Sequence, residues 1–85
     1  MTETEFDIID ELYFVTSFAE LATTLFLEEN ELSRSLQQLL KQGYVKCFFP
    51  DADTEVEYEP VTFQEQGTRY YFLATKAGLM AHNSR

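Results

Sequence analysis

The sequence is poor in several residue types, and each shortage excludes a class of protein. Its 85 residues include one cysteine, Cys47, which excludes an internal disulfide and fits a reducing compartment. No apolar run approaches the roughly 20 residues that a membrane-spanning helix needs. The N-terminal stretch MTETEFDIID carries acids and no basic residue, so we do not expect a secretory signal there. These absences predict a soluble cytoplasmic protein, and the length predicts one domain, residues 1–85.

Basic residues are also scarce, and charge is arranged in blocks. Six Lys and Arg stand against fifteen Asp and Glu, which gives a net charge of −9. The acids all lie in residues 1–31 and 51–65, whereas the basic residues all lie in 34–46 and 69–85. Such a layout can favour pairing within the fold or between copies. Solvated faces that carry whichever charge keeps them soluble explain it equally well.

Apolar residues are plentiful by contrast. They make up 45% of the chain and include eight Phe and five Tyr, although there is no Trp. This content predicts a folded protein. So many aromatic rings in a small domain indicate a dense core, an adhesive surface, or both.

Apolar residues at helical spacing predict three helices, over residues 4–14, 18–26 and 30–42. Ser17 and Glu20 have the spacing of a capping box, which favours a helix start at residue 18. Gly43 is a good stop for the third helix, because glycine readily adopts the left-handed conformation that ends helices. The first helix is expected to be amphipathic, with Phe6, Ile9 and Tyr13 on one stripe and Ile8 and Leu12 beside it. The third helix is expected to bury a stripe of Leu32, Leu36, Leu39 and Leu40.

The second half of the chain predicts strands. Strands are indicated by aromatic and β-branched residues in YVKCFF (44–49) and YYFLA (70–74), and by alternating polarity in TEVEYEP (54–60). A very short strand fits FVT (14–16). QEQGTR (64–69) predicts a turn in which Gly67 is free to take a positive φ. Thr75 is expected to cap a short last helix, which Gly78 weakens.

Three segments in this order resemble the winged helix-turn-helix family. SFAELATTL is similar to the first helix of the helix-turn-helix pair, LSRSLQQLLKQGYV to the second helix and the first wing strand, and YFLATKAGL to the closing strand and last helix. The resemblance implies an α+β winged helix, with three to four helices and a small antiparallel β-sheet that includes a wing hairpin. One feature departs from the family: residues 50–69 carry six acids and only Arg69 to oppose them.

A DNA-binding function of the transcription-regulator type is one hypothesis. The resemblance implies that helix 30–42 enters the major groove. The side chains on its outer face suit base contacts, although they are also ordinary solvent-facing helix residues. These DNA-contact candidates are Asn30, Arg34, Gln37, Gln38 and Lys41. The acids around them oppose binding to phosphates, so charge disfavours DNA.

A protein-interaction or regulatory module is the preferred hypothesis. If Val45, Cys47 and Leu73 point into the core, other aromatic rings point outward and form a patch that marks a partner site. These interaction candidates are Phe48, Tyr58, Tyr70 and Phe72, which Phe63 can join in place of Tyr58. Alternatively, the long hairpin folds back or the first helix lies across these rings and covers them. A homodimer through the first helix and the sheet face is the simplest arrangement, and a basic protein partner is equally allowed.

Catalysis is not expected. The sequence holds one histidine, His82, and Cys47 in a predicted strand, where an inert buried thiol is the more common case. It contains no nucleophile motif, metal-ligand spacing or phosphate-binding glycine loop. DADTEVE (51–57) lacks the glycine and the bidentate Glu of a calcium loop. We therefore predict no enzyme activity, no cofactor and no metal.

Overall fold

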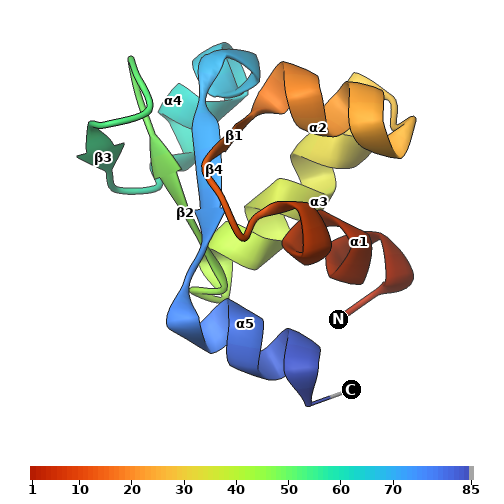
Figure 1. Ribbon diagram of the computed structural model, residues 1–85. Coiled ribbons are helices and arrows are strands. Elements are labelled where there is room, and N and C mark those ends of the chain that lie inside the picture. The colour runs from red at the N-terminus through yellow and green to blue at the C-terminus, as the bar shows by residue number, and fades with distance from the viewer. Residues whose placement is uncertain (85) are drawn as a thin grey trace.

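The computed structural model describes residues 1–84, which form an α+β fold of five α-helices and a four-stranded antiparallel sheet (Figure 1). The strands lie in the order β1-β4-β2-β3. In chain order the elements are α1 (Glu3–Glu11), β1 (Thr16–Ser17), α2 (Phe18–Leu25), α3 (Glu29–Lys41), β2 (Val45–Phe48), β3 (Glu55–Val56), α4 (Pro60–Gln66), the 3-10 helix η1 (Gly67–Arg69), β4 (Tyr71–Ala74) and α5 (Lys76–Asn83).

Local capping fixes where α2 and α5 begin. At α2 the Ser17 hydroxyl accepts from the Glu20 amide at 3.1 Å, and the Glu20 carboxylate accepts from the Ser17 amide at 3.3 Å. This confirms the predicted capping box. The Thr75 hydroxyl caps α5 in the predicted way and accepts from the Gly78 amide at 3.1 Å.

The predicted leucine stripe of α3 is confirmed, since Leu32, Leu36, Leu39 and Leu40 are all buried. Gly43 follows the helix with φ +75°. Its amide donates to Leu40 O, and the Tyr44 amide donates to Leu39 O. These two bonds complete a Schellman ending, which turns the chain from α3 into β2.

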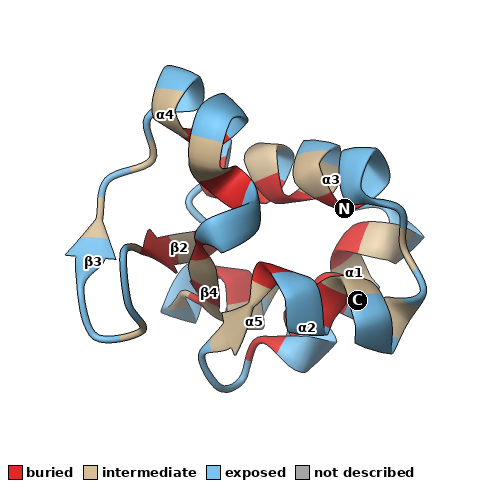
Figure 2. Ribbon diagram, turned by 90° about the horizontal axis from the view of Figure 1, so that it is seen from above, coloured by how far each residue is buried: buried red, intermediate tan, exposed pale blue. Residues whose placement is uncertain are grey.

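The core lies between the helices and one face of the sheet, where buried residues gather (Figure 2). Val45 pairs with Ala74 and Cys47 pairs with Phe72, so these four side chains share the inner face. Leu73 pairs with Lys46 on the other face. The prediction that Leu73 points inward and Phe72 outward is therefore wrong by one residue of strand register.

The segment between β2 and β4, residues 49–70, folds back over the core and corrects three predictions. Strand 54–60 is reduced to Glu55–Val56. The predicted turn at 64–69 is instead the end of α4 followed by η1, and Gly67 has φ −57°. Space at this position is still narrow, because a Cβ at residue 67 would lie 3.1 Å from the Phe63 ring, closer than most Cβ contacts.

Helix α4 forms where it does because its start is capped and one ring anchors it. The Glu59 carboxylate accepts from the Val61 amide at 3.4 Å, and Pro60 occupies the first turn, where its missing N–H costs nothing. Phe63 is buried, and its ring lies roughly perpendicular to the rings of Tyr70 and Phe72 at centroid distances of 5.8 and 6.2 Å. These ring contacts hold the segment against the sheet.

Candidate interaction surfaces

The predicted aromatic patch is not exposed. Phe48, Tyr70 and Phe72 are only 8%, 2% and 0% exposed, and Tyr58 is half-buried. Tyr70 stacks on Phe49 with ring centroids 5.0 Å apart. The prediction of an outward aromatic surface is therefore wrong for these residues, and the alternative, in which the hairpin folds back over them, describes the structure.

A different set of apolar side chains is exposed, in the loop between α1 and β1. Tyr13 is 49% exposed, Phe14 81% and Val15 38%. Helix α1 ends at Glu11, so Leu12 takes the buried place in which Tyr13 was predicted, and Tyr13 lies outside the helix. The sequence signal was the run of four consecutive apolar residues, Leu12 to Val15, between two capped helices. We call residues 13–15 the aromatic loop.

Hydrogen bonds hold the aromatic loop in one conformation. The Thr16 hydroxyl donates to Phe14 O at 2.9 Å and lies 3.2 Å from Glu11 O. The Ala74 amide of β4 donates to Leu12 O at 3.0 Å. Because both ends are fixed to α1 and to the sheet, the loop presents its side chains without a large ordering cost.

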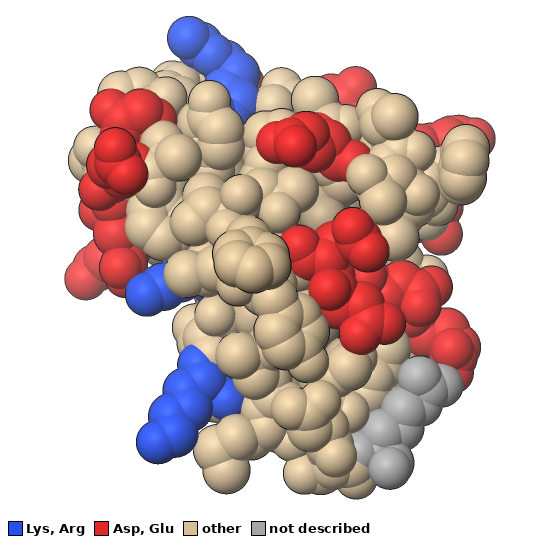
Figure 3. Space-filling view, in the orientation of Figure 1, with Lys and Arg blue, Asp and Glu red and all other residues tan. Residues whose placement is uncertain are grey.

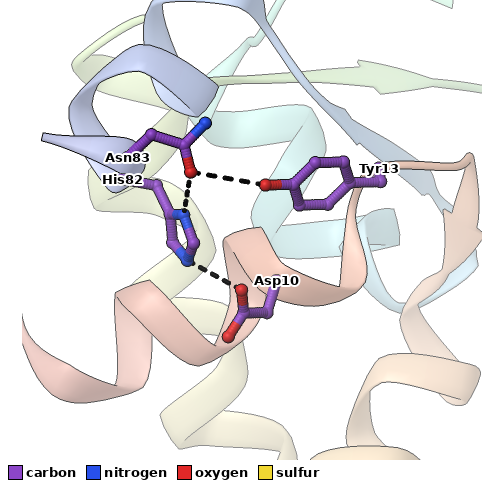
Figure 4. Close-up of polar contacts among 4 residues, drawn as sticks. All are labelled: Asp10, Tyr13, His82 and Asn83. Carbon is purple, nitrogen blue, oxygen red and sulfur yellow. Dashed lines mark hydrogen bonds and ion pairs between the residues drawn. The ribbon is translucent and has the colours of Figure 1, made fainter.

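A polar cluster joins the aromatic loop to α1 and α5 (Figure 4). His82 Nε2 lies 2.7 Å from Asp10 Oδ1, and His82 Nδ1 lies 3.1 Å from Asn83 Oδ1. The Tyr13 hydroxyl lies 3.5 Å from the same amide oxygen. The His82 ring also packs against Phe6 at 5.5 Å. Helix α5 thus borders the loop through Asn83.

Charge flanks this surface on two sides. Figure 3 shows an uncharged strip down the middle of the molecule, with acidic side chains over α1 on its right and basic side chains beside β2 and the start of α5 on its lower left. The acids of α1 include Asp7, Asp10 and Glu11, while Lys46 and Lys76 belong to β2 and α5. Lys46 also pairs with Glu55 at 3.6 Å. A second acidic group lies over β3 on the left (Figure 3).

The DNA-contact candidates lie on α3. Asn30, Arg34, Gln38 and Lys41 are exposed, and their spacing places them along one ridge of the helix. Gln37 is half-buried beside this ridge. The acids at the start of the helix, Glu28, Glu29 and Glu31, are also exposed, and Glu31 lies about one turn from Arg34.

Phe26 is the most exposed large apolar side chain of residues 1–84, at 93%. It follows α2 with φ 56° and ψ 42°, in the left-handed region. Its amide donates to Ala22 O, and the Leu27 amide donates to the same oxygen at 3.1 Å. The predicted helix 18–26 ends at this residue, but nothing in the pattern showed that Phe26 would be left-handed and exposed.

Residues 1–84 contain no cluster of three or more His, Cys, Asp or Glu side chains able to hold a metal ion, and they enclose no pocket. No helix in this part of the chain has the length and apolar content to cross a membrane. Cys47 is buried, and its thiol lies 3.5 Å from Val56 O. Burial raises the pKa of this thiol to about 11, with a further contribution from the Glu55 carboxylate. Such a thiol is a poor nucleophile near neutral pH.

Comparison with known proteins gives no relative: no family model, no curated protein and no solved structure matches the chain.

Proposed function

We propose that the chain is a small, non-catalytic protein-interaction module of winged-helix type, which pairs with a second copy of itself through the aromatic loop. The observation that carries this proposal is the 81% exposure of Phe14 in a loop held by hydrogen bonds on an uncharged strip. Exposed apolar groups on a pre-ordered surface are typical of partner sites. The winged-helix type is supported by the succession α2, α3, β2, β4 and by the sheet order in which β4 lies between β1 and β2.

Charge complementarity favours a second copy as the partner. A two-fold axis along the uncharged strip turns one copy over, so its acidic α1 side meets the basic side of the other (Figure 3). The same contact occurs twice, because the arrangement is symmetric. Tyr13, Phe14 and Val15 then pack near the axis, and the loop of each copy covers that of the other.

Sedimentation velocity over a range of protein concentrations tests this proposal. We expect the wild-type chain to dimerise at low salt, with an affinity that falls at about 0.5 M NaCl as the flanking charges are screened. Phe14→Ser should be monomeric at concentrations where the wild type is dimeric, because it removes a central apolar contact. Lys76→Glu should weaken the dimer by placing like charges against α1.

Phe26→Ser is the matched control, since it removes another exposed phenylalanine that lies outside the aromatic loop. It should dimerise as the wild type does. A wild-type chain that remains monomeric at every concentration, or a Phe14→Ser variant with unchanged association, would contradict self-pairing through this loop.

A transcription-regulator-type DNA-binding domain is the second candidate, favoured by the exposed ridge of Asn30, Arg34, Gln38 and Lys41 on α3. If α3 reads DNA, a pool of random-sequence duplexes should bind at low salt and dissociate steeply as salt rises. Arg34→Ala should weaken that binding and reduce the salt dependence. Absence of binding at low salt would remove this candidate and leave the dimer proposal unaffected.

A further inference from the structure

Phe26 adopts a backbone conformation that a phenylalanine does not favour. Only glycine, and to a lesser extent asparagine, takes the left-handed region at little cost, whereas a bulky side chain there is an outlier. The usual residue for a left-handed helix ending is glycine, and this chain uses one in that role at Gly43, after α3. The conformation at Phe26 therefore opposes folding.

Burial of the side chain does not offset this cost in free energy, because Phe26 is 93% exposed. Its neighbours Leu25 and Leu27 are half-buried and pack on the core, so the ring stands on a fixed base. Packing within this chain does not account for the residue. Strained, exposed and rigidly held side chains are found at binding sites, where a partner recovers the cost.

The surroundings of Phe26 define the chemistry of that partner. Exposed Thr23 and Thr24 precede it, and exposed Glu28, Glu29 and Glu31 follow it. Residues 23–31 include no Lys or Arg. The ring thus projects from an acidic rim, which repels nucleic acid and anionic membranes and attracts basic groups. Since the projection is convex, the concave element must come from the partner.

We propose that Phe26 anchors a basic amphipathic helix of another protein. The phenyl ring enters the space between four apolar side chains of that helix, as a knob enters a hole. Lys and Arg residues that border the apolar face of the helix then meet Glu28, Glu29 and Glu31. This inference does not rest on the proposed dimer, because the connection between α2 and α3 lies at the opposite end of α2 from the aromatic loop (Figure 1).

The test uses a synthetic amphipathic peptide of Leu and Lys, about 18 residues long so that it can form a helix. Its counterpart carries Glu in place of every Lys. Each peptide is titrated into the isotopically labelled full chain, and backbone amide signals are followed by NMR. We expect the Leu/Lys peptide to shift the signals of residues 23–31 and the Leu/Glu peptide to shift none.

Phe26→Asn is the decisive variant, because asparagine accepts the left-handed backbone and leaves the charge unchanged. Its affinity for the Leu/Lys peptide should fall at least about tenfold. Phe14→Ser should bind the peptide as the wild type does, which separates this site from the aromatic loop.

Four results would overturn the proposal. Phe26→Asn could bind the peptide as tightly as the wild type, or the shifts could spread over α1 and residues 51–59, and either would mean that acidic charge alone attracts the peptide. Phe26-dependent sedimentation with phosphatidylcholine vesicles would assign the ring to a membrane. Loss of the dimer in Phe26→Asn, without loss in Phe14→Ser, would assign it to a second copy.

Discussion

Gly78 is the third residue of α5, where the helix crosses the backbone of Tyr44. A Cβ at this position would overlap the Tyr44 carbonyl oxygen, which is backbone and cannot rotate away. The Thr75 amide donates to the same oxygen at 3.0 Å, and the Thr75 hydroxyl donates to Gly43 O at 2.6 Å. The glycine that weakens α5 as an isolated helix thus permits its close packing on the sheet.

Gly78→Ala should therefore destabilise the fold, although the same change in an unhindered helix stabilises it by about 0.5–1 kcal/mol. We expect the free energy of unfolding to fall by about 2–3 kcal/mol, the upper range for overpacking. Urea unfolding followed by circular dichroism measures it. Ala77→Gly, at the exposed neighbouring position, is the control and should cost about 1 kcal/mol from helix propensity alone. A Gly78→Ala variant as stable as the wild type would show that α5 does not approach Tyr44 so closely.

Single residues also mark what the sequence could and could not predict. The caps at Ser17 and Thr75 and the ending at Gly43 depend on neighbours within a few positions, so the local pattern was sufficient. The inward residue of β4 depends on which residue lies opposite Cys47, and that is set by strands distant in the sequence. Alternation within β4 allowed either Leu73 or Phe72 to point into the core, and only the strand register determines that it is Phe72.

At the scale of elements, α4 shows why a polar stretch was read as a turn. Its seven residues contain one buried apolar residue, Phe63, so no helical stripe is visible in PVTFQEQ. The helix is stabilised by the contact of that one ring with Tyr58, Tyr70 and Phe72, which tertiary structure brings together. The same contact covers the rings that alternation had placed on the surface.

The aromatic loop shows the opposite error, because its residues were predicted to lie in a helix and a strand. YFV was divided between the end of a helix and a short strand, because apolar residues were assigned to ordered elements. Helix α1 ends earlier, and Leu12 fills the core, so the next three residues remain outside. An element boundary two to three residues from its predicted place was thus enough to hide the candidate surface.

At the scale of the whole molecule, the blocks of charge in the sequence become sides of one surface. The sequence showed that acidic and basic residues do not mix, but it could not show that α1 and the start of α5 would flank a common uncharged strip. That arrangement follows from the packing of α5 beside α1. The contact between His82 and Asp10 joins these two helices. Two copies that each carry a net charge of −9 repel each other at long range. A symmetric dimer must therefore bring acidic and basic side chains of the two copies into direct contact.

Alkaline pH tests the packing of residues 49–70 over the sheet. Burial raises the pKa values of the Cys47 thiol, to about 11, and of the Tyr58 and Tyr70 hydroxyls, and nearby negative charges add to each shift. The folded protein therefore disfavours the ionised forms. The unfolded chain ionises its thiol near pH 8.5–9, so the stability linked to Cys47 is complete below about pH 9 and is lost as pH rises to about 11. A difference of about two pKa units corresponds to about 2–3 kcal/mol.

Urea unfolding at about pH 8, 9, 10 and 11 measures this loss, and Cys47→Ala isolates the thiol. The variant should be less stable at pH 8, because it leaves a small cavity, yet it should lose less stability than the wild type between pH 9 and 11. Any stability that the variant still loses as pH rises comes from other ionising groups. Tyr58 and Tyr70 are among them, because ionisation of their hydroxyls at higher pH also destabilises the folded protein. Equal pH dependence in the two proteins would mean that water reaches the thiol, and hence that residues 49–70 do not close over β2 as described.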